Sequence, residues 1–247
     1  MHEAGPSGGR AALVALALMV GNDVDVARGE PPLPPRRPPE LAPAAPSGQT
    51  LQSPPPAPSE GEPAECLAKL LASGVRAEAA APQTSSAEGC GINAPVRLSS
   101  ITALSGDVVS LPDQPLVDCA FAAVLADYVR LVVAPLGEAM LHAKVAAIET
   151  GPGYECRTQD RIAGAKISAH AKGLAVDFVA ISFADKRRLL IERQTGADES
   201  SYFRVVRTAA CGWFTTVLGP GADAFHANNM HLDIEQHGAS ASYRICE

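Results

Sequence analysis

The sequence lacks an excess of positive charge and contains no cysteine pair of the C-x-x-C type. Its 20 Lys and Arg residues are outnumbered by 27 Asp and Glu residues, which gives a formal net charge of -7. Nucleic acids are bound through clustered cationic side chains, and no basic stripe runs along this chain, so we expect no nucleic-acid partner. The missing C-x-x-C pair argues against a zinc ribbon and against a thioredoxin-like redox motif.

Six cysteines are nevertheless present, and all lie in the later part of the chain: Cys66, Cys90, Cys119, Cys156, Cys211 and Cys246. An even number of cysteines without metal-binding spacing is typical of disulfides formed in an oxidising compartment. We therefore predict three disulfides and an exported protein, periplasmic or secreted. The connectivity stays open at this point. Position along the chain favours Cys211–Cys246, then Cys119–Cys156, and leaves Cys66–Cys90.

The N-terminal part lacks an apolar run long enough to cross a bilayer comfortably. Residues 11–20 are apolar and have about the length of a signal-peptide core. We interpret residues 1–29 as a signal peptide or N-terminal hydrophobic segment, which would also allow a membrane tether. A soluble N-terminal extension is the alternative. No cysteine lies near this run, so a lipid anchor is not supported.

Residues 30–65 are rich in proline and contain few large apolar side chains. Such a composition cannot bury enough apolar surface to offset the entropy lost on folding, so we predict a disordered linker. The linker is either a spacer that holds a domain away from a membrane or a low-complexity tail. Residues 66–247 are then expected to form one domain of about 180 residues.

Within residues 66–247, helices come mainly before strands and the late strands are short, which favours an α+β fold over a doubly wound sheet. The main core helix is expected after Asp118, a good N-cap, because apolar residues recur there at i, i+3, i+4 and i+7. Pro135 should break or restart this helix, and a second helical stretch should reach about His142. We interpret His142 as structural or exposed. Further helices are expected at 66–71 and 200–210, and strands at 96–98, 145–149, 187–192 and 213–218.

The strongest chemical signal is the run Ser168 to Asp177, which reads Ser-x-His-x-x-Gly-x-Ala-x-Asp. It contains a candidate nitrogen ligand, His170, and a candidate oxygen ligand, Asp177. Gly173 and the β-branched content favour a loop that enters a strand, so that His170 can fold back towards Asp177.

A second signal follows later, where His231, Asp233 and Glu235 alternate with apolar residues as on one side of a strand. Three protein ligands with an open position for water are typical of a catalytic zinc site, and His170, Asp177 and His231 would supply them. The alternative is that Asp177 caps a turn and that both histidines are merely hydrogen-bonded polar residues.

The ten-residue motif followed by a strand-borne histidine is similar to the zinc D-Ala-D-Ala carboxypeptidases and their hedgehog-type relatives. Residues 66–247, with Gly-Tyr-Glu-Cys-Arg at 153–157 and Tyr-Arg-Ile-Cys-Glu at 243–247, more closely resemble the bacterial extensin-like C-terminal domain family. The resemblance implies a disulfide-linked α+β domain with a small antiparallel sheet and helices packed on one side. It also implies Zn²⁺ as cofactor, a D,D- or L,D-type peptidase activity, and peptidoglycan or another cell-wall component as partner.

Arg157 lies where the related peptidases have an arginine upstream of the metal motif. A guanidinium there would hold a terminal carboxylate bidentately or steady a developing oxyanion. The alternative for Arg157 is a surface ion pair. For Ser168, orientation of the substrate or loop and formation of a turn remain two open interpretations.

The sequence departs from the related peptidases at the general base. The carboxypeptidases have a Glu three positions before the last His ligand, and a related branch has a His two positions before it. Here these positions are Asn228 and Asn229, which cannot accept a proton from water. His226 is our candidate base, provided that the turn after it curls back, and Asp233 is the competitor or a residue that orients a ligand. Two functions therefore remain, a zinc-dependent peptidoglycan hydrolase and a non-catalytic cell-wall-binding module.

Overall fold

The computed structural model describes residues 61–85, 87–238 and 243–247, which all belong to one structural unit. The expected signal segment and most of the expected linker lie outside the described residues. Helix α1 spans Gly61–Ala72, so residues 61–65, which the sequence assigned to the linker, are helical. The helix is held to the domain because Leu70 is buried and Cys66 is disulfide-bonded to Cys119.

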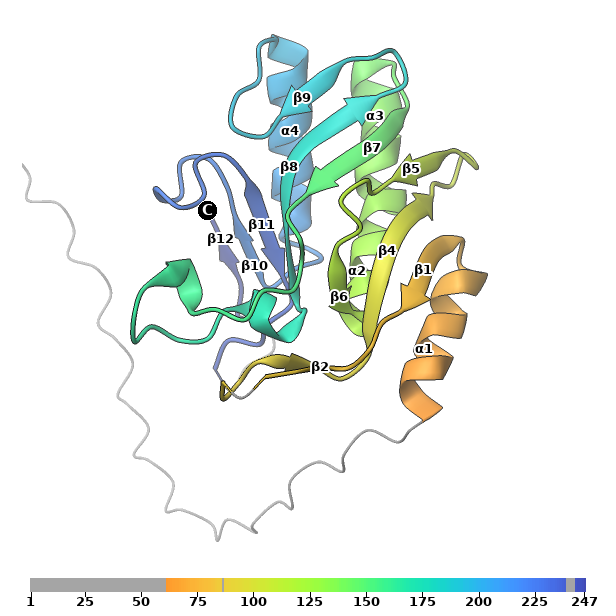
Figure 1. Ribbon diagram of the computed structural model, residues 1–247. Helices are drawn as coiled ribbons and strands as arrows, with labels where there is room; N and C mark the ends of the chain where they lie inside the picture. Colours follow the sequence, from red (N-terminus) through yellow and green to blue (C-terminus); the bar gives the residue numbers. More distant parts are fainter. Residues whose placement is uncertain (1–60, 86, 239–242) are drawn as a thin grey trace, which may run out of the picture. The chain divides into compact units, whose positions relative to one another are not determined.

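Ten strands form the main sheet, in the order β1–β4–β5–β7–β8–β11–β10–β12, with β6 paired to β4 and β9 paired to β8 (Figure 1). All pairs in it are antiparallel except β5 with β7 and β10 with β12. The α+β class is confirmed, but the sheet is larger than expected and mixed. The strands are β1 (Val75–Ala79), β4 (Pro95–Thr102), β5 (Val108–Ser110), β6 (Leu116–Asp118), β7 (Val145–Thr150), β8 (Ala175–Phe183), β9 (Arg188–Leu190), β10 (Thr216–Leu218), β11 (Met230–Asp233) and β12 (Ile245–Cys246), and a separate pair is β2 (Gln83–Thr84) with β3 (Gly91–Ile92).

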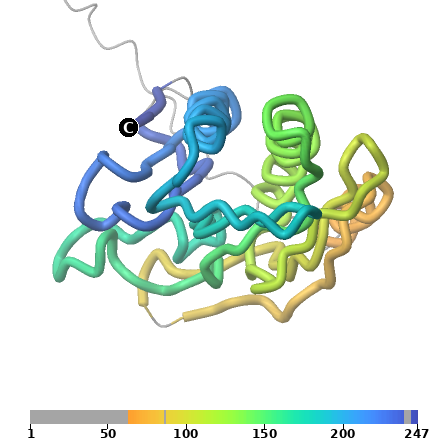
Figure 2. The backbone as a smooth tube through the Cα atoms, turned by 90° about the horizontal axis from the view of Figure 1, so that it is seen from above, coloured from red at the N-terminus to blue at the C-terminus, as the bar shows by residue number. Residues whose placement is uncertain are grey.

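Helices α2 (Cys119–Tyr128), α3 (Ala134–Leu141) and α4 (Ala197–Ala210) pack on one face of the sheet (Figures 1 and 2). Asp118 caps α2 as expected, because its carboxylate accepts the N–H of Ala120 at 2.9 Å. Pro135 lies in the first turn of α3, so the second helical stretch restarts there and ends at His142 as expected. A wide π-helical stretch, Val129–Val133, precedes the proline and keeps residues 119–141 helical.

The run Cys119–Leu141 is long and apolar enough to cross a membrane by length and composition. In this domain it serves as the core helix, because Phe121, Leu125 and Tyr128 are fully buried against the sheet and α4. Tyr128 also donates its hydroxyl to the Val206 carbonyl of α4 at 2.9 Å. Burying each such large side chain is worth about 1.5–3 kcal/mol, so the helical layer holds the sheet firmly from behind.

Strands β8 and β11 each present one face to this core. Val176, Phe178 and Leu232 are fully buried in the hydrophobic cluster. Since neighbouring side chains on a strand point to opposite faces, the residues between them, Asp177 and His231, point to the other face. The apolar alternation of the two strands therefore places the polar motif residues away from the helices.

The six cysteines form three disulfides, and one of the expected pairs, Cys211–Cys246, is confirmed. The other two expected pairs are wrong. Helix α1 packs beside the start of α2, which brings Cys66 to Cys119, and the turn after β2 reaches the loop that precedes the motif, which brings Cys90 to Cys156. These are contacts between segments distant in sequence, and order along the chain could not rank them.

The other expected elements were found with shifted ends. Expected strands 145–149 and 187–192 correspond to β7 and β9, and the expected helix at 200–210 corresponds to α4. The strand expected at 213–218 is reduced to β10, because the N–H groups of Trp213 and Phe214 still donate to Ala210 in the turn that ends α4. His142 is exposed and caps α3 in a left-handed conformation with φ of 50°, which fits its interpretation as structural or exposed.

Candidate metal centre

A short 3₁₀ turn, Ala169–Lys172, carries His170 and precedes β8. Ser168 begins the turn, and its hydroxyl oxygen accepts the N–H of His170 at 3.3 Å, so the turn-forming interpretation describes its contact. Gly173 ends the turn with φ of 67°, and an added Cβ there would lie 2.7 Å from the backbone nitrogen of Asp118. A glycine is required here both by the left-handed backbone and by this close approach.

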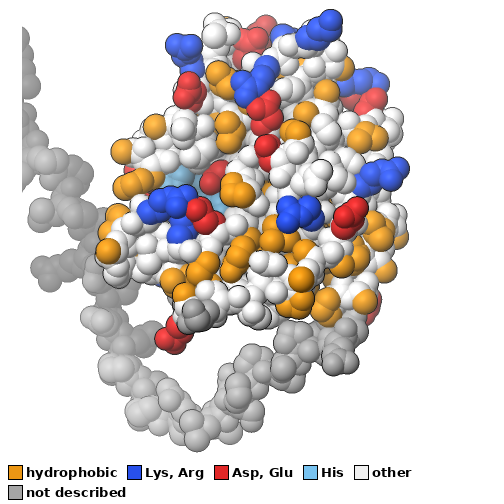
Figure 3. All heavy atoms as spheres, in the orientation of Figure 1, with side chains coloured by type: hydrophobic (Ala, Val, Ile, Leu, Met, Phe, Trp, Pro, Cys, Tyr) orange, Lys and Arg blue, Asp and Glu red, His pale blue; other side chains and the backbone are white. Residues whose placement is uncertain are grey.

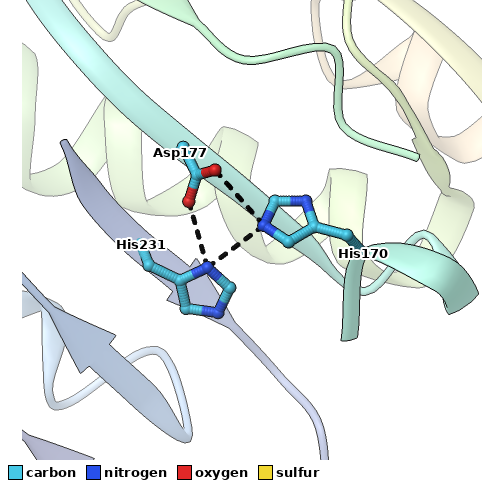
Figure 4. A group of neighbouring side chains, drawn as sticks. All are labelled: His170, Asp177 and His231. Carbon is cyan, nitrogen blue, oxygen red and sulfur yellow. Dashed lines mark hydrogen bonds and ion pairs between the residues drawn. The ribbon is translucent and has the colours of Figure 1, made fainter. Parts of the chain in front are cut away.

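Strand pairing brings the other two motif residues together, since His231 on β11 lies directly opposite Asp177 on β8. Directly opposed residues have Cβ atoms about 4.5–5.5 Å apart, so their side chains meet on the face away from the helices. The turn folds His170 onto the same point (Figure 4). One ligand atom from each residue lies within 4.8 Å of the other two.

The separations between these atoms match those of a tetrahedral metal site. His170 Nε2 lies 3.2 Å from His231 Nδ1 and 3.4 Å from Asp177 Oδ2, and His231 Nδ1 lies 3.0 Å from Asp177 Oδ1. Zinc bonds to nitrogen and oxygen are about 2.0–2.1 Å long, so two ligands in a tetrahedron are separated by about 3.3 Å. The side chains therefore already stand at ligand spacing.

The Gly153 carbonyl fixes the tautomer of His170, whereas both ring nitrogens of His231 lie 3.0 Å from a carboxylate, and the tautomer that donates to Asp233 is the one that can bind a metal through Nδ1. His170 Nδ1 donates to the Gly153 carbonyl oxygen at 2.7 Å, and His231 Nε2 donates to Asp233 Oδ2 at 3.0 Å. In neutral rings with these partners, the two facing nitrogens carry lone pairs and cannot hydrogen-bond to each other. Two lone pairs and a carboxylate then converge, an arrangement that requires a cation or a proton between them.

The pKa shifts of Asp177 and His231 also indicate that the centre attracts positive charge. Burial alone would raise the pKa of Asp177, but hydrogen bonds and charge from His170 and His231 hold it well below its usual range. Burial alone would lower the pKa of His231, but the carboxylates of Asp177 and Asp233 raise it to about 9. The centre thus favours positive charge strongly enough to hold a proton when nothing else supplies it.

Asp233, expected either as a base or as an orienting residue, lies behind His231. It is 4% exposed, and its Oδ1 accepts from the Thr215 hydroxyl and from the Glu235 N–H, both at 3.0 Å. With Oδ2 accepting from His231, both oxygens are engaged. The contacts are those of a residue that orients a metal ligand.

His226, our candidate base, lies in the loop between β10 and β11. Its ring stands 5.6 Å from the ring of His231, centroid to centroid, so the turn does curl back towards the centre. Asp223 fixes the ring, because its carboxylate accepts from Nδ1 at 2.8 Å and from the backbone N–H of His226 at 2.9 Å. The sequence analysis missed Asp223. An Asp three residues before a histidine in a turn-rich loop would have been the signal for it.

Arg157 lies at the wall of the cavity beside the centre. Its Nε donates to Glu155 Oε2 at 2.8 Å and its Nη1 donates to the Thr158 carbonyl at 3.3 Å. Among the described residues none accepts from Nη2. The expected ion pair therefore exists, and Nη2 is the part of the guanidinium left to steady an oxygen atom.

A cavity of about 260 Å³ opens next to the centre and is lined by both metal-motif histidines, Arg157 and His226. Figure 3 shows histidine side chains recessed between basic and acidic side chains on this face. Glu235 shares the side of His231 and Asp233 as the strand pattern predicted, and it is paired with two lysines that the sequence analysis did not single out. Lys166 and Lys172 donate to it at 2.7 and 2.6 Å.

Fold and site together define a disulfide-linked α+β domain with a His-Asp-His candidate metal centre beside a cavity. The chain belongs to the family described as Extensin-like protein C-terminus, whose model matches residues 64–247. No curated protein and no solved structure matches the chain. The likeness to zinc peptidases therefore stays a prediction from the motif.

Proposed function

We propose that this protein is an exported zinc-dependent hydrolase that acts on peptide bonds of peptidoglycan in the cell envelope. The observation that carries the proposal is the convergence of two imidazole lone pairs and one carboxylate at the spacing of zinc ligands. His170, Asp177 and His231 would hold the ion. The donor set of two nitrogens and one oxygen fits zinc, and Gly153 and Asp233 supply the supporting hydrogen bonds that such ligands need.

A zinc ion held by these three residues would supply a bound water of pKa about 7 and would polarise a carbonyl group. The chain's own residues complete the chemistry. His226, held through Nδ1 by Asp223, presents its other ring nitrogen as a proton acceptor and later returns the proton to the leaving amine. Arg157 Nη2 steadies the negative charge that develops on the carbonyl oxygen.

Compartment and substrate are inferred from less specific features. The three disulfides and the extensin-like domain favour an exported protein, periplasmic or secreted. The proline-rich residues 30–60 suit a spacer, and the resemblance of the motif to D,D-peptidases points to short peptides of the cell wall. A D,D- or L,D-type peptidase fits all three.

A non-catalytic wall-binding module is the second candidate. It is favoured by Asn228 and Asn229, which stand where the related peptidases have a titratable base. In the structure Asn229 donates to the Phe225 carbonyl and to the Asn228 side chain, which are structural contacts within the loop. The two candidates differ in turnover, because a binding module would retain the wall without cutting it.

The test uses the full chain purified with its disulfides formed. Its metal content is measured, and purified sacculi are digested with the zinc-loaded protein and analysed by mass spectrometry. His231→Ala should lose the metal, His226→Ala should keep the metal and lose about 10²-fold or more in rate, and His142→Asn, at an exposed histidine, should match the wild type. Binding to sacculi without any released peptide would favour the wall-binding module.

A further inference from the structure

The candidate metal centre lies between two cavities. The larger, of about 260 Å³, is lined by His170, and the smaller, of about 140 Å³, is lined by Asp177. His231 lines both cavities, as do His226 and Arg157. The three candidate ligands therefore face two different spaces, and the point between them can be approached from either one.

This arrangement bears on which bonds can reach the centre. An enzyme that removes one terminal residue needs room for a long chain on one side only and a closed end on the other. Here His226 and Arg157 line both cavities and so stand between them, with one cavity on each side. A chain that extends from one cavity into the other would place an internal bond, rather than a terminal one, beside His226 and His231.

We propose that the site hydrolyses an internal peptide bond of a chain that continues into both cavities. This inference rests on the proposed hydrolase function. The reaction is simple hydrolysis: water gives its hydroxyl to the carbonyl carbon, the C–N bond breaks, and the proton accepted by His226 passes to the leaving nitrogen. No further reactant is needed.

The smaller cavity has the features of a binding site for peptide. Asp160, Arg161 and Asn229 line it and offer polar groups to the backbone of a bound chain. Phe225, on the wall of the same cavity, is 53% exposed and offers an apolar contact.

The larger cavity is also lined by charged and polar side chains. Lys166 and Glu235 line it and pair with each other at 2.7 Å, and Thr216 and His237 lie on the same wall, 2.7 Å apart. A chain segment with charged groups therefore suits either side, and Phe225 adds an apolar contact in the smaller cavity. The substrate class that fits both cavities is a short peptide of mixed charge that extends at least two residues on each side of the cut.

The first test examines where the bonds are cut. Purified cross-linked peptide dimers and uncross-linked peptide monomers from peptidoglycan are digested with the zinc-loaded full chain, and the products are weighed by mass spectrometry. We expect fragments of two or more residues on both sides of the cut. Release of single terminal residues alone would overturn the internal-bond proposal and leave the hydrolase standing, whereas no cleavage of either substrate would overturn both.

The second test examines the two cavities separately. Phe225→Ala alters the smaller cavity and Lys166→Ala alters the larger one, and each should lower kcat/KM by about tenfold or more while zinc content stays unchanged. Leu104→Ala, which removes an exposed apolar side chain from the turn between β4 and β5, is the matched control and should match the wild type. An effect of only one of the two cavity variants would contradict binding on both sides.

Discussion

Replacing Asp233 by Asn is the most informative single change at the candidate metal centre, because it keeps the size of the side chain and removes only its charge and one acceptor. Asp233 Oδ1 accepts two hydrogen bonds, from the Thr215 hydroxyl and the Glu235 N–H, while Oδ2 accepts from His231 Nε2. The Glu235 N–H can only donate, so the amide oxygen of an Asn must stay on that side.

The amide NH₂ group would then face His231 Nε2 and donate to it. His231 would be driven to the tautomer that carries its proton on Nδ1, the nitrogen that faces His170 and Asp177. Zinc would have to reverse this preference before binding. Losing such an orienting partner typically costs 10–100-fold in metal affinity, or about 1.4–2.8 kcal/mol, since each tenfold is about 1.4 kcal/mol.

The assay is a competition titration of zinc between the full chain and a chromogenic chelator, for the wild type and for Asp233→Asn. Asp185→Asn, at an exposed carboxylate on the turn between β8 and β9, is the matched control and should bind as the wild type does. Circular dichroism establishes that the variants stay folded. Wild-type zinc affinity in Asp233→Asn would refute the assignment of the His231 tautomer and with it the orienting role.

Three further outcomes follow from the geometry. Asp223→Asn should keep zinc and leave KM unchanged while lowering kcat by up to about 10²-fold, because Asp223 holds the ring and backbone of His226 and lines neither cavity. An unchanged kcat in steady-state assays would remove Asp223 as a positioning residue. In urea unfolding, Gly173→Ala should destabilise the fold by about 1–2 kcal/mol through its left-handed backbone, and by more because the added Cβ would meet the backbone of Asp118 and the side chain of Ile92. Replacing Cys90 and Cys156 together by Ser should cost about 2–5 kcal/mol in the same measurement, and a smaller loss would mean that this disulfide adds little.

Local patterns predicted the elements that carry the site. The glycine at 173 and the apolar alternation after it indicated a turn entering a strand, and the alternation around His231 indicated the second strand. These patterns are informative because successive side chains of a strand point to opposite faces, so the alternation shows which residues face the core and which face away from it. The convergence of His170, Asp177 and His231 followed from the whole motif.

Contacts between segments far apart in the chain could not be predicted from the sequence. The pairing of Cys66 with Cys119 depends on how α1 packs against α2, and the register of β8 with β11 depends on the whole sheet. The π-helical stretch that joins α2 to α3 was not predicted, because no local sequence pattern indicates such a stretch. Asp223 was missed although its contact with His226 is local, because nothing in the sequence placed this loop beside His231.

X-ray absorption at the zinc edge of the full chain tests the central claim most directly, since it reports the atoms bound to the metal and their distances. The account predicts one zinc per chain with nitrogen and oxygen neighbours at about 2.0–2.1 Å, imidazole scattering from two histidines, and loss of this signal in His231→Ala. A zinc shell containing sulfur at about 2.3 Å, or a zinc signal that persists unchanged in His231→Ala, would contradict the assignment of His170, Asp177 and His231 as the metal centre.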